Sequence, residues 1–149
     1  MDRSTIITHL AFAVYEPDIS TFALLNSKLH NAWSAMLCGR MRKDFRYSTT
    51  IVYNTFPLPS LSQAQRETLE QHGWQIISAR EMHPGKDIAW LYDPDIMPSN
   101  LRDAHRALDE FLERIYIGRS FKNDSERREH LLKLYAEMAS VKEKEVASA

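Results

Sequence analysis

The sequence contains little cysteine and little glycine, and each shortage excludes a class of site. Its single cysteine, Cys38, allows no disulfide within the chain, which suits a reducing compartment and predicts a cytoplasmic location. With four glycines, the chain has neither a GxGxxG nor a Walker pattern, which excludes the common phosphate-cradling loops. No apolar run approaches the ~18 residues of a membrane-spanning helix, and no signal-peptide pattern is present, so we expect no membrane segment.

Residues that would assemble a metal or catalytic site are also scarce. There is no CxxC motif, and none of the six histidines has a second histidine or a cysteine at helical spacing. Asp109 is four residues after His105, a pair typical of a surface interaction. Asp93 and Asp95 flank Pro94, which favours a turn over a carboxylate pair. Because no nucleophile, base and orienting group come together, we expect no catalytic, cofactor-binding or metal-binding residues in this chain.

Charge is unevenly distributed along the chain, although the formal net charge is only −1. From Lys28 to Arg46 there are five cations and one anion, a local charge of +4, so the other residues together carry −5. The density of charged residues is highest in the sequence GRMRKDFR. Its charged residues are Arg40, Arg42, Lys43, Asp44 and Arg46. Such a cluster is typical either of contact with a localised anionic partner or of a solvated helix end.

The N-terminal part of the sequence favours a mixed α and β structure. Residues 6–15 are apolar and partly β-branched, which predicts a strand. Apolar residues then recur at helical spacing and predict one helix over residues 18–37. Asp18 or Ser20 suits the start of this helix, and Gly39 suits its end.

A second extended segment comes next, and after it the sequence becomes helical. Residues 45–56 are rich in β-branched and aromatic side chains and predict one long strand or two short ones. The sequence Leu58-Pro59-Ser60 predicts a boundary. We expect Asn100 to cap a helix that ends at Gly118. The expected helices cover residues 62–81, 87–92, 100–117 and 124 to about 141, with fraying beyond.

These elements predict an α+β fold class. Residues 1–59 should form a small β-sheet with one long helix, and residues 60–149 should form a small helical domain. The chain should be mainly helical overall.

The basic segment at residues 40–46 has the residue types that bind DNA. Arginine and lysine supply phosphate contacts, and arginine also reads guanine through bidentate hydrogen bonds. Aspartate accepts a hydrogen bond from cytosine N4. Because Arg42 and Asp44 are two residues apart, their side chains would point the same way on an extended segment. Such a pair is suited to reading one base pair.

Several longer segments carry a resemblance to a known family. LLNSKLHNAW, CGRMRKDFRYS and IVYNTFPLP are followed by LYDPDIMPSNLRDAHRALD and ERREHLLKLYAEM. In this order they resemble the C-terminal end of the MmeI-like enzymes, large single-chain restriction and modification proteins that include methylase-only relatives. The resemblance implies an endonuclease domain and an adenine-specific, S-adenosylmethionine-dependent methyltransferase domain upstream. A target recognition domain and a small helical C-terminal domain would then follow.

By this resemblance, residues 1–59 correspond to the last portion of the target recognition domain and residues 60–149 to the C-terminal domain. The chain lacks the family's catalytic Asn/Asp-Pro-Pro-Tyr motif, its cofactor-binding motif and any nuclease motif. S-adenosylmethionine is the cofactor of the full-length family, and we expect none in this chain. A natural truncation and a fragment of a longer protein both fit this extent.

The resemblance also assigns roles within the basic segment. It implies that Arg42, Lys43 and Asp44 are the variable residues that face DNA. It implies phosphate-side or framework roles for Arg40, Arg46, Tyr47 and Ser48. Tyr53, Asn54 and Phe56 would hold the recognition domain onto the C-terminal domain. The partners implied are double-stranded DNA and an upstream methyltransferase domain.

Two functions therefore remain open on the sequence. The first is a DNA-recognition fragment of a methyltransferase-type protein. The second is a protein-interaction or oligomerisation module without DNA-binding activity of its own. A homodimer is compatible with either, because a partial recognition domain would leave strand edges and apolar surface uncovered, notably at residues 6–15.

Overall fold

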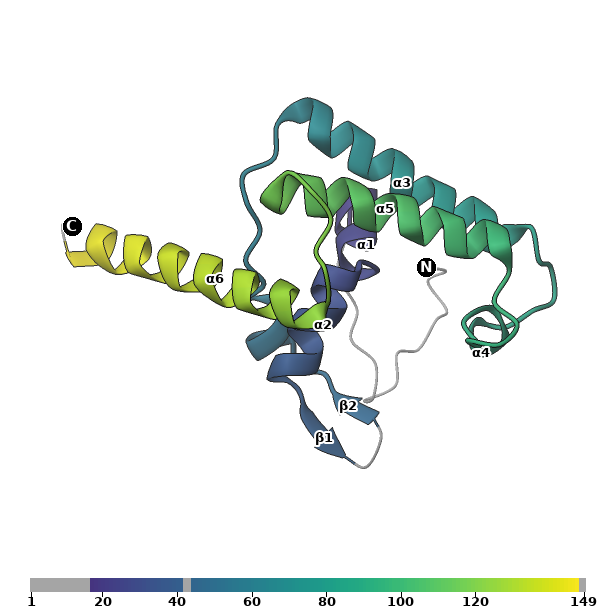
Figure 1. Ribbon diagram of the computed structural model, residues 1–149, viewed down its shortest axis with the longest axis horizontal. Helices are drawn as coiled ribbons and strands as arrows, with labels where there is room; N and C mark the ends of the chain where they lie inside the picture. Colours follow the sequence, from purple (N-terminus) through teal and green to yellow (C-terminus); the bar gives the residue numbers. More distant parts are fainter. Residues whose placement is uncertain (1–16, 42–43, 148–149) are drawn as a thin grey trace.

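The computed structural model describes residues 17–41 and 44–147 of the protein (Figure 1). In chain order its elements are α1 (Ile19–Leu25), α2 (Lys28–Leu37), β1 (Gly39–Met41), β2 (Asp44–Arg46), η1 (Thr49–Tyr53), α3 (Gln63–Glu81), α4 (Ile88–Leu91), α5 (Ser99–Ile117) and α6 (Asp124–Ala147). Helices α3 and α5 lie side by side, and α1 packs against α3 (Figure 1). Helix α2 continues from α1 and packs against α6.

The α+β fold class expected from the sequence is wrong for the described residues. Their architecture is helical, and extended structure is confined to β1 and β2, which have three residues each and pair as one hairpin. These residues form no larger sheet, and the helices pack on one another instead. The strand expected at residues 6–15 lies outside the described residues.

The single helix expected over residues 18–37 is in fact two helices. Asp18 caps α1 through its carboxylate, as expected. Ser27 then interrupts the helix: its hydroxyl donates to the Leu24 carbonyl at 2.7 Å and accepts from the His30 amide at 3.2 Å. A buried serine that bonds the end of one helix and the start of the next stabilises a break, which apolar spacing alone does not reveal.

The strand expected over residues 45–56 ends at Arg46, and the β-branched run after it forms the π-helical turn η1. Ser48 caps this turn by accepting a hydrogen bond at 3.4 Å from the amide three residues later. Val52 is fully buried, and its carbonyl accepts the indole N–H of Trp33 at 3.2 Å. Strand propensity depends on packing context, and here the packing of Val52 against α2 decides the conformation.

Helix α3 forms where the sequence predicts it. Ser62 and Gln65 make a reciprocal capping box, with N–H to side-chain distances of 2.8 and 3.2 Å. Gly73 is buried where α1 crosses the helix: a Cβ there would lie 2.5 Å from Ile19 Cγ2 and 2.9 Å from the Ile19 carbonyl oxygen. Glycine is therefore needed at this position for the close approach of α1.

Helices α4 and α5 also match the predicted segments, with one correction. Asp87 caps α4, and Gly118 ends α5 in the left-handed conformation with a φ of 74°. The cap expected from Asn100 is wrong, because Pro98 occupies the N-cap position of α5. The Asn100 amide instead donates to the Ala79 carbonyl at 3.3 Å and so links α5 to α3.

Helix α6 is joined to α5 by a buried ion pair. It begins at Asp124, as expected, and remains helical beyond Val141. Arg127 donates to one Glu113 oxygen from Nε at 2.8 Å and from Nη2 at 2.6 Å. The other Glu113 oxygen accepts the Phe121 amide at 2.9 Å. The Glu113 carboxylate therefore holds both the connecting loop and the first turn of α6.

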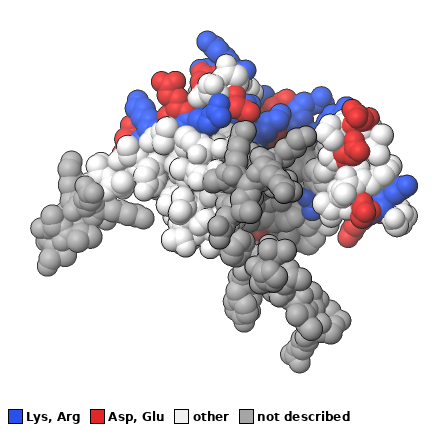
Figure 2. Space-filling model, turned by 90° about the horizontal axis from the view of Figure 1, so that it is seen from below, with Lys and Arg blue, Asp and Glu red and all other residues white. Residues whose placement is uncertain are grey.

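The surface separates into charged and uncharged areas. Figure 2 shows lysine, arginine and acidic side chains along the upper edge and at the right end of the view, and an area without charge toward the left. Helix α6 runs outward from the other helices (Figure 1) and exposes Leu132, Tyr135, Met138 and Val141. Within the described ranges, no helix is long and apolar enough to cross a membrane.

Candidate nucleic-acid interface

The described residues of the charged segment expected to face DNA lie in a two-stranded hairpin. Strands β1 and β2 are antiparallel, and the paired positions are Gly39 with Arg46, Arg40 with Phe45, and Met41 with Asp44. Gly39 begins β1 and does not close the preceding helix as the sequence suggested. The hairpin projects from the end of α2, on the side away from α3 and α5 (Figure 1).

The structure describes some of the predicted DNA-binding residues and not others. The backbone of three of them lies in the hairpin: Arg40, Asp44 and Arg46. Arg42 and Lys43 lie outside the described residues, as do the side chains of residues 39–46. Tyr47 and Ser48 come directly after β2, and their side chains are described. The DNA contacts assigned to these seven residues stay predictions.

An aromatic platform, defined as His30, Trp33, Tyr47 and Phe56, supports the base of the hairpin. The Tyr47 hydroxyl lies 3.2 Å from His30 Nε2. Phe56 contacts the His30 ring edge-on at a centroid distance of 5.3 Å and the Trp33 ring at 6.5 Å. Burial lowers the pKa of His30 and raises the pKa of Tyr47, so both side chains are neutral at neutral pH.

Both ends of the hairpin are therefore fixed to the helical body. Strand β1 comes directly after α2, and β2 continues through Tyr47 and Ser48 into η1. Ser48 caps η1, and Trp33 bonds the η1 backbone, so these side chains form part of the supporting framework. A two-stranded ribbon held in this way is narrow enough to enter a DNA major groove.

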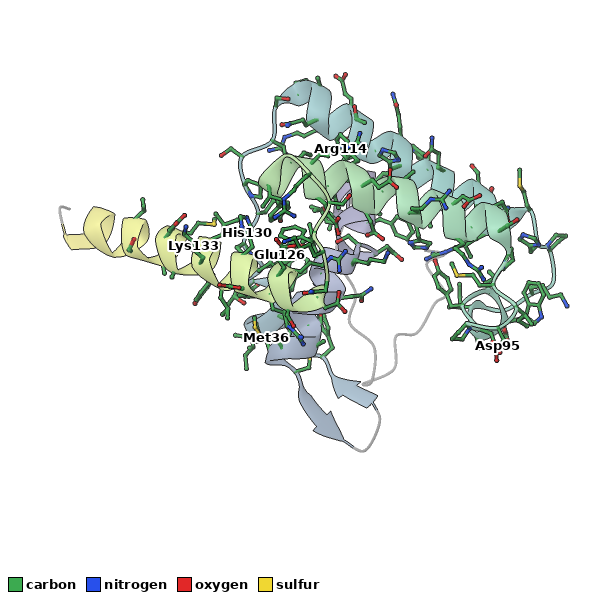
Figure 3. All side chains as sticks on the ribbon, viewed as in Figure 1. Met36, Asp95, Arg114, Glu126, His130 and Lys133 are labelled. Carbon is green, nitrogen blue, oxygen red and sulfur yellow. The ribbon has the colours of Figure 1, made fainter. Side chains whose placement is uncertain are left out.

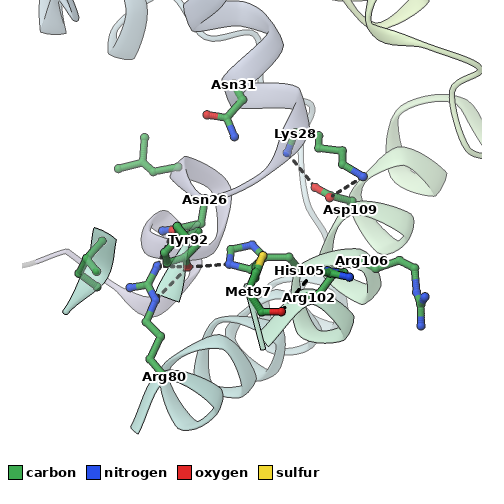
Figure 4. Close-up of a pocket in the computed structure, with 12 residues that line it drawn as sticks. Asn26, Lys28, Asn31, Arg80, Tyr92, Met97, Arg102, His105, Arg106 and Asp109 are labelled. Carbon is green, nitrogen blue, oxygen red and sulfur yellow. Dashed lines mark hydrogen bonds and ion pairs between the residues drawn. The ribbon is translucent and has the colours of Figure 1, made fainter. Parts of the chain in front are cut away.

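A second group of polar residues, the polar junction, connects the two halves of the chain. It consists of Asn26, Arg80, Tyr92 and His105. Arg80 donates to the Tyr92 hydroxyl from Nε at 2.9 Å and to Asn26 Oδ1 from Nη2 at 2.9 Å. The Tyr92 hydroxyl lies 2.7 Å from His105 Nε2, which completes the chain of contacts in Figure 4.

Lys28 and Asp109 lie beside this junction. Asp109 accepts the Lys28 amide at 2.7 Å and approaches Lys28 Nζ at 3.5 Å, so it acts as a cap for α2 from another helix. The surface pair with His105 suggested by the sequence is wrong, since Asp109 is buried and bonds Lys28. Burial raises the pKa of Asp109, and burial followed by the charge of Arg80 lowers the pKa of His105.

A cavity of about 710 Å³ opens between the junction and helices α2, α4 and α5 (Figure 4). Four cationic residues line it: Lys28, Arg80, Arg102 and Arg106. No sequence motif indicates this cavity, because its residues are far apart in the sequence. Asn26 and Arg80 are 54 positions apart, and Arg80 and Tyr92 are 12 apart. Among the residues that the structure describes, no cluster of histidine, cysteine and acidic side chains could hold a metal ion.

Comparison with known proteins identifies the class to which this helical body and charged hairpin belong. Residues 1–60 match the family model described as the MmeI target recognition domain, and residues 61–142 match the MmeI C-terminal domain. Both are domains of DNA methyltransferase-type restriction-modification proteins. The chain belongs to the MmeI family and contains sequence from these two domains. The resemblance inferred from the sequence motifs is thereby confirmed.

Two relatives show how much of such a protein the chain represents. It is 40% identical over 134 residues to DNA methyltransferase A of Bacillus subtilis (strain 168), a match that covers 90% of the chain and 15% of that protein. It also superposes on the Type IIL restriction-modification enzyme MmeI, solved in complex with DNA, with a TM-score of 0.80 and 34% identity. That match covers 84% of the chain and 17% of MmeI. The chain thus spans about one sixth of each relative.

Proposed function

We propose that this chain contributes sequence-specific DNA binding to a restriction-modification protein of the methyltransferase type. Residues 1–59 would form the end of the recognition domain, and residues 60–149 the helical C-terminal domain that supports it. The observation that carries the proposal is the hairpin, which bears the densest part of the +4 segment on a narrow projection from the body. The relative solved in complex with DNA supports the same function.

The charged residues of the segment 40–46 divide between two tasks in this proposal. Arg42 and Asp44 read a base pair, since a bidentate arginine recognises guanine and an aspartate accepts from cytosine. Arg40, Lys43 and Arg46 hold the phosphate backbone, which adds affinity without sequence preference. Tyr47 and Ser48 belong to the framework at the hairpin base.

Two substitutions test this division, made in a full-length relative that carries the present segment. Arg42→Ala should relax preference at one base pair by about 5- to 150-fold, because a bidentate contact contributes roughly 1–3 kcal/mol of discrimination. Arg46→Ala should weaken binding to all sequences alike and flatten the salt dependence by about one unit. The measurement is binding to a set of duplexes with single base-pair changes, over a range of salt concentrations.

Lys133→Ala is the matched control, because Lys133 is an exposed cation on α6, away from the hairpin (Figure 3). It should leave both base preference and salt slope unchanged. Equal losses for every duplex with Arg42→Ala and Arg46→Ala would refute the reading role and leave only an electrostatic patch.

A second candidate function is a protein-interaction or oligomerisation module. It is favoured by the apolar side chains exposed on α6, of which Val141 is 54% and Leu132 47% exposed. Sedimentation of the chain at micromolar concentration would then show a dimer, or a complex with an added methyltransferase domain. In this reading the chain has no DNA-binding activity of its own, and Leu132→Glu should abolish the association. Only the DNA-binding function predicts a strong log–log salt dependence.

We further propose that the isolated chain binds no S-adenosylmethionine and transfers no methyl group. The sequence lacks the family's catalytic and cofactor-binding motifs. Incubation with labelled S-adenosylmethionine and mixed DNA should therefore transfer no label above that seen with boiled protein. Any reproducible transfer would show that catalytic residues exist which the motifs do not reveal.

A further inference from the structure

The cavity beside the polar junction contains more positive charge than its own acidic residues neutralise. Of its cationic lining residues, Lys28 pairs with Asp109, and Arg106 pairs with Asp103 at 2.9 Å. Arg80 and Arg102 have no acidic partner among the described residues. Two guanidinium groups therefore border one cavity without a carboxylate to balance them.

Arg80 is held in a fixed position, although it is only half-buried. Its guanidinium carbon lies 5.1 Å from the ring centroids of both Phe22 and Tyr92. Its Nε and Nη2 atoms bond the neutral side chains of Tyr92 and Asn26. Its Nη1 atom makes no hydrogen bond within the described part of the chain. A partly buried positive charge with only neutral partners is unfavourable unless an anion reaches it.

The other walls of the cavity are suited to a phosphate group. Arg102 donates to the Met97 carbonyl at 3.2 Å and keeps its remaining donors free of described partners. Asn31 and Lys28 add polar groups from α2. Arginine binds phosphate oxygens with two parallel hydrogen bonds, and a guanidinium that is already immobilised loses little entropy on binding.

We propose that this cavity is a phosphate-binding site, with Arg80 and Arg102 as its principal ligands and Lys28 as a third cation at its edge. The phosphate group has two sources of the same chemistry, the backbone of duplex DNA and a free mononucleotide. In the first case the site rests on the proposed DNA-binding function and anchors the C-terminal domain beside the hairpin. In the second case it is a small-molecule site between the two halves.

Sodium phosphate is the probe in the first experiment, titrated into the full chain at constant ionic strength with sodium chloride as the comparison. Amide chemical shifts of Lys28 and His105 should change saturably with phosphate only. Arg80→Gln and Arg102→Gln should each lower phosphate affinity by about tenfold, as expected for loss of a charge-assisted hydrogen bond.

Arg114→Gln is the matched control, because Arg114 is an exposed arginine of the same helix as Arg102 that does not line the cavity (Figure 3). It should bind phosphate like the unsubstituted chain. Because Arg80 also packs between two rings, Arg102→Gln provides the test if Arg80→Gln fails to fold. Shifts that chloride reproduces, or that Arg102→Gln leaves unchanged, would overturn the proposal.

Duplex DNA and adenosine monophosphate then distinguish the two sources. If DNA occupies the site, Arg102→Gln should weaken binding to every sequence alike and reduce the salt slope by about 0.9. If a mononucleotide occupies it, the nucleotide should bind with Arg102-dependent affinity, and DNA affinity should not change. Phosphate binding by the chain, together with equal losses for every duplex from Arg42→Ala and Arg46→Ala in the full-length relative, would uphold this site and refute the reading role proposed for the hairpin segment.

Discussion

Two arginines from different regions of the molecule satisfy their charge in opposite ways. Arg127, in the first turn of α6, has a side chain 11% exposed and pairs with Glu113 of α5, whose side chain is 4% exposed. Arg80, at the junction of the two halves, bonds a phenol and an amide and stacks on two rings. The first charge is neutralised within the fold. The charge of Arg80 is held in place by neutral groups and remains available to bind an anion.

This contrast separates charges that build the fold from charges that bind a partner. A buried carboxylate and arginine need each other, since removal of either leaves the other charged and desolvated. Arg80 has no acidic partner among the described residues, so its removal leaves no charge stranded there. The α5–α6 end should therefore be sensitive to loss of one charge, and the polar junction should be sensitive to added anions.

Glu113→Gln should give the largest effect. The change keeps the side-chain shape but removes the buried partner of Arg127, which then keeps only the exposed Asp124 at 2.7 Å. About 3 kcal/mol of unfolding free energy should be lost, the low end for breaking a buried pair. Urea denaturation measures the loss. Glu110→Gln, at an exposed position on the same helix, should stay within about 0.5 kcal/mol of the unsubstituted chain. Similar losses of unfolding free energy in the Glu113 and Glu110 variants would contradict the structural role assigned to the pair of Arg127 and Glu113.

Gly73→Ala should destabilise the junction side of the molecule by about 1–3 kcal/mol, the usual range for overpacking. The added Cβ would overlap Ile19 and move α1, which leads into Asn26 of the polar junction. Ser78→Ala, at an exposed position of the same helix, should be neutral or slightly stabilising. Amide hydrogen exchange should show the Gly73 effect in α1 before α6; faster exchange in α6 first would contradict this order.

Arg80→Gln should lower the free energy of unfolding by about 1–2 kcal/mol, through lost hydrogen bonds and ring stacking. This loss should be smaller than that of Glu113→Gln, because no buried charge is left without its partner. Thermal denaturation of both variants in parallel makes the comparison. The unsubstituted chain should gain stability in phosphate buffer, and the Arg80 variant should gain less.

The smallest expected effect is a pH dependence at the junction. The pKa of His105 in the folded chain lies below its ordinary value of 6.5, so the unfolded chain binds more protons between the two values. Its contribution is therefore fully present above 6.5 and is lost as the pH falls through that value toward the folded pKa. Arg80 from α3 and Lys28 from α2 strengthen this effect.

Urea denaturation at about pH 7.5 and about pH 5.5 measures the difference, across the range in which histidine titrates. His105→Gln should reduce it, and His72→Gln, outside the junction, should not. His30 has a lowered pKa and should leave a residual dependence of the same sign. The raised pKa of Asp109 acts in the opposite direction, because that group binds its proton more readily in the folded chain. An unchanged pH dependence in the His105 variant would contradict the assignment.

Features set by neighbouring residues could be predicted from the sequence, and those set by distant contacts could not. The cap at Asp18, the start of α3 and the end of α5 at Gly118 depend on local chemistry and were predicted correctly. The break at Ser27 was missed because apolar spacing continues across it. The β-branched residues 49–53 form η1 because Val52 packs into the core beside Trp33, a residue 19 positions away.

The candidate sites show the same division. The charge cluster at residues 40–46 is visible in the sequence, but the extended structure predicted at residues 45–56 includes only residues 45–46 of the hairpin, and β1 was not predicted. The polar junction has no signal in the sequence, since its members come from separate elements and meet only in the folded chain. Arg80 in particular could not be linked to Tyr92 and His105 by any spacing, because it belongs to a different helix.

The contacts between the two halves have a consequence for inheritance. Ile19 packs on Gly73, Asn26 bonds Arg80, and Lys28 bonds Asp109. In each pair, the first residue belongs to the segment that matches the recognition domain and the second to the segment that matches the C-terminal domain. A genetic crossover between two relatives near residue 60 would separate all three pairs. Recombinants that exchange both segments together should therefore survive more often than recombinants that exchange the recognition segment alone.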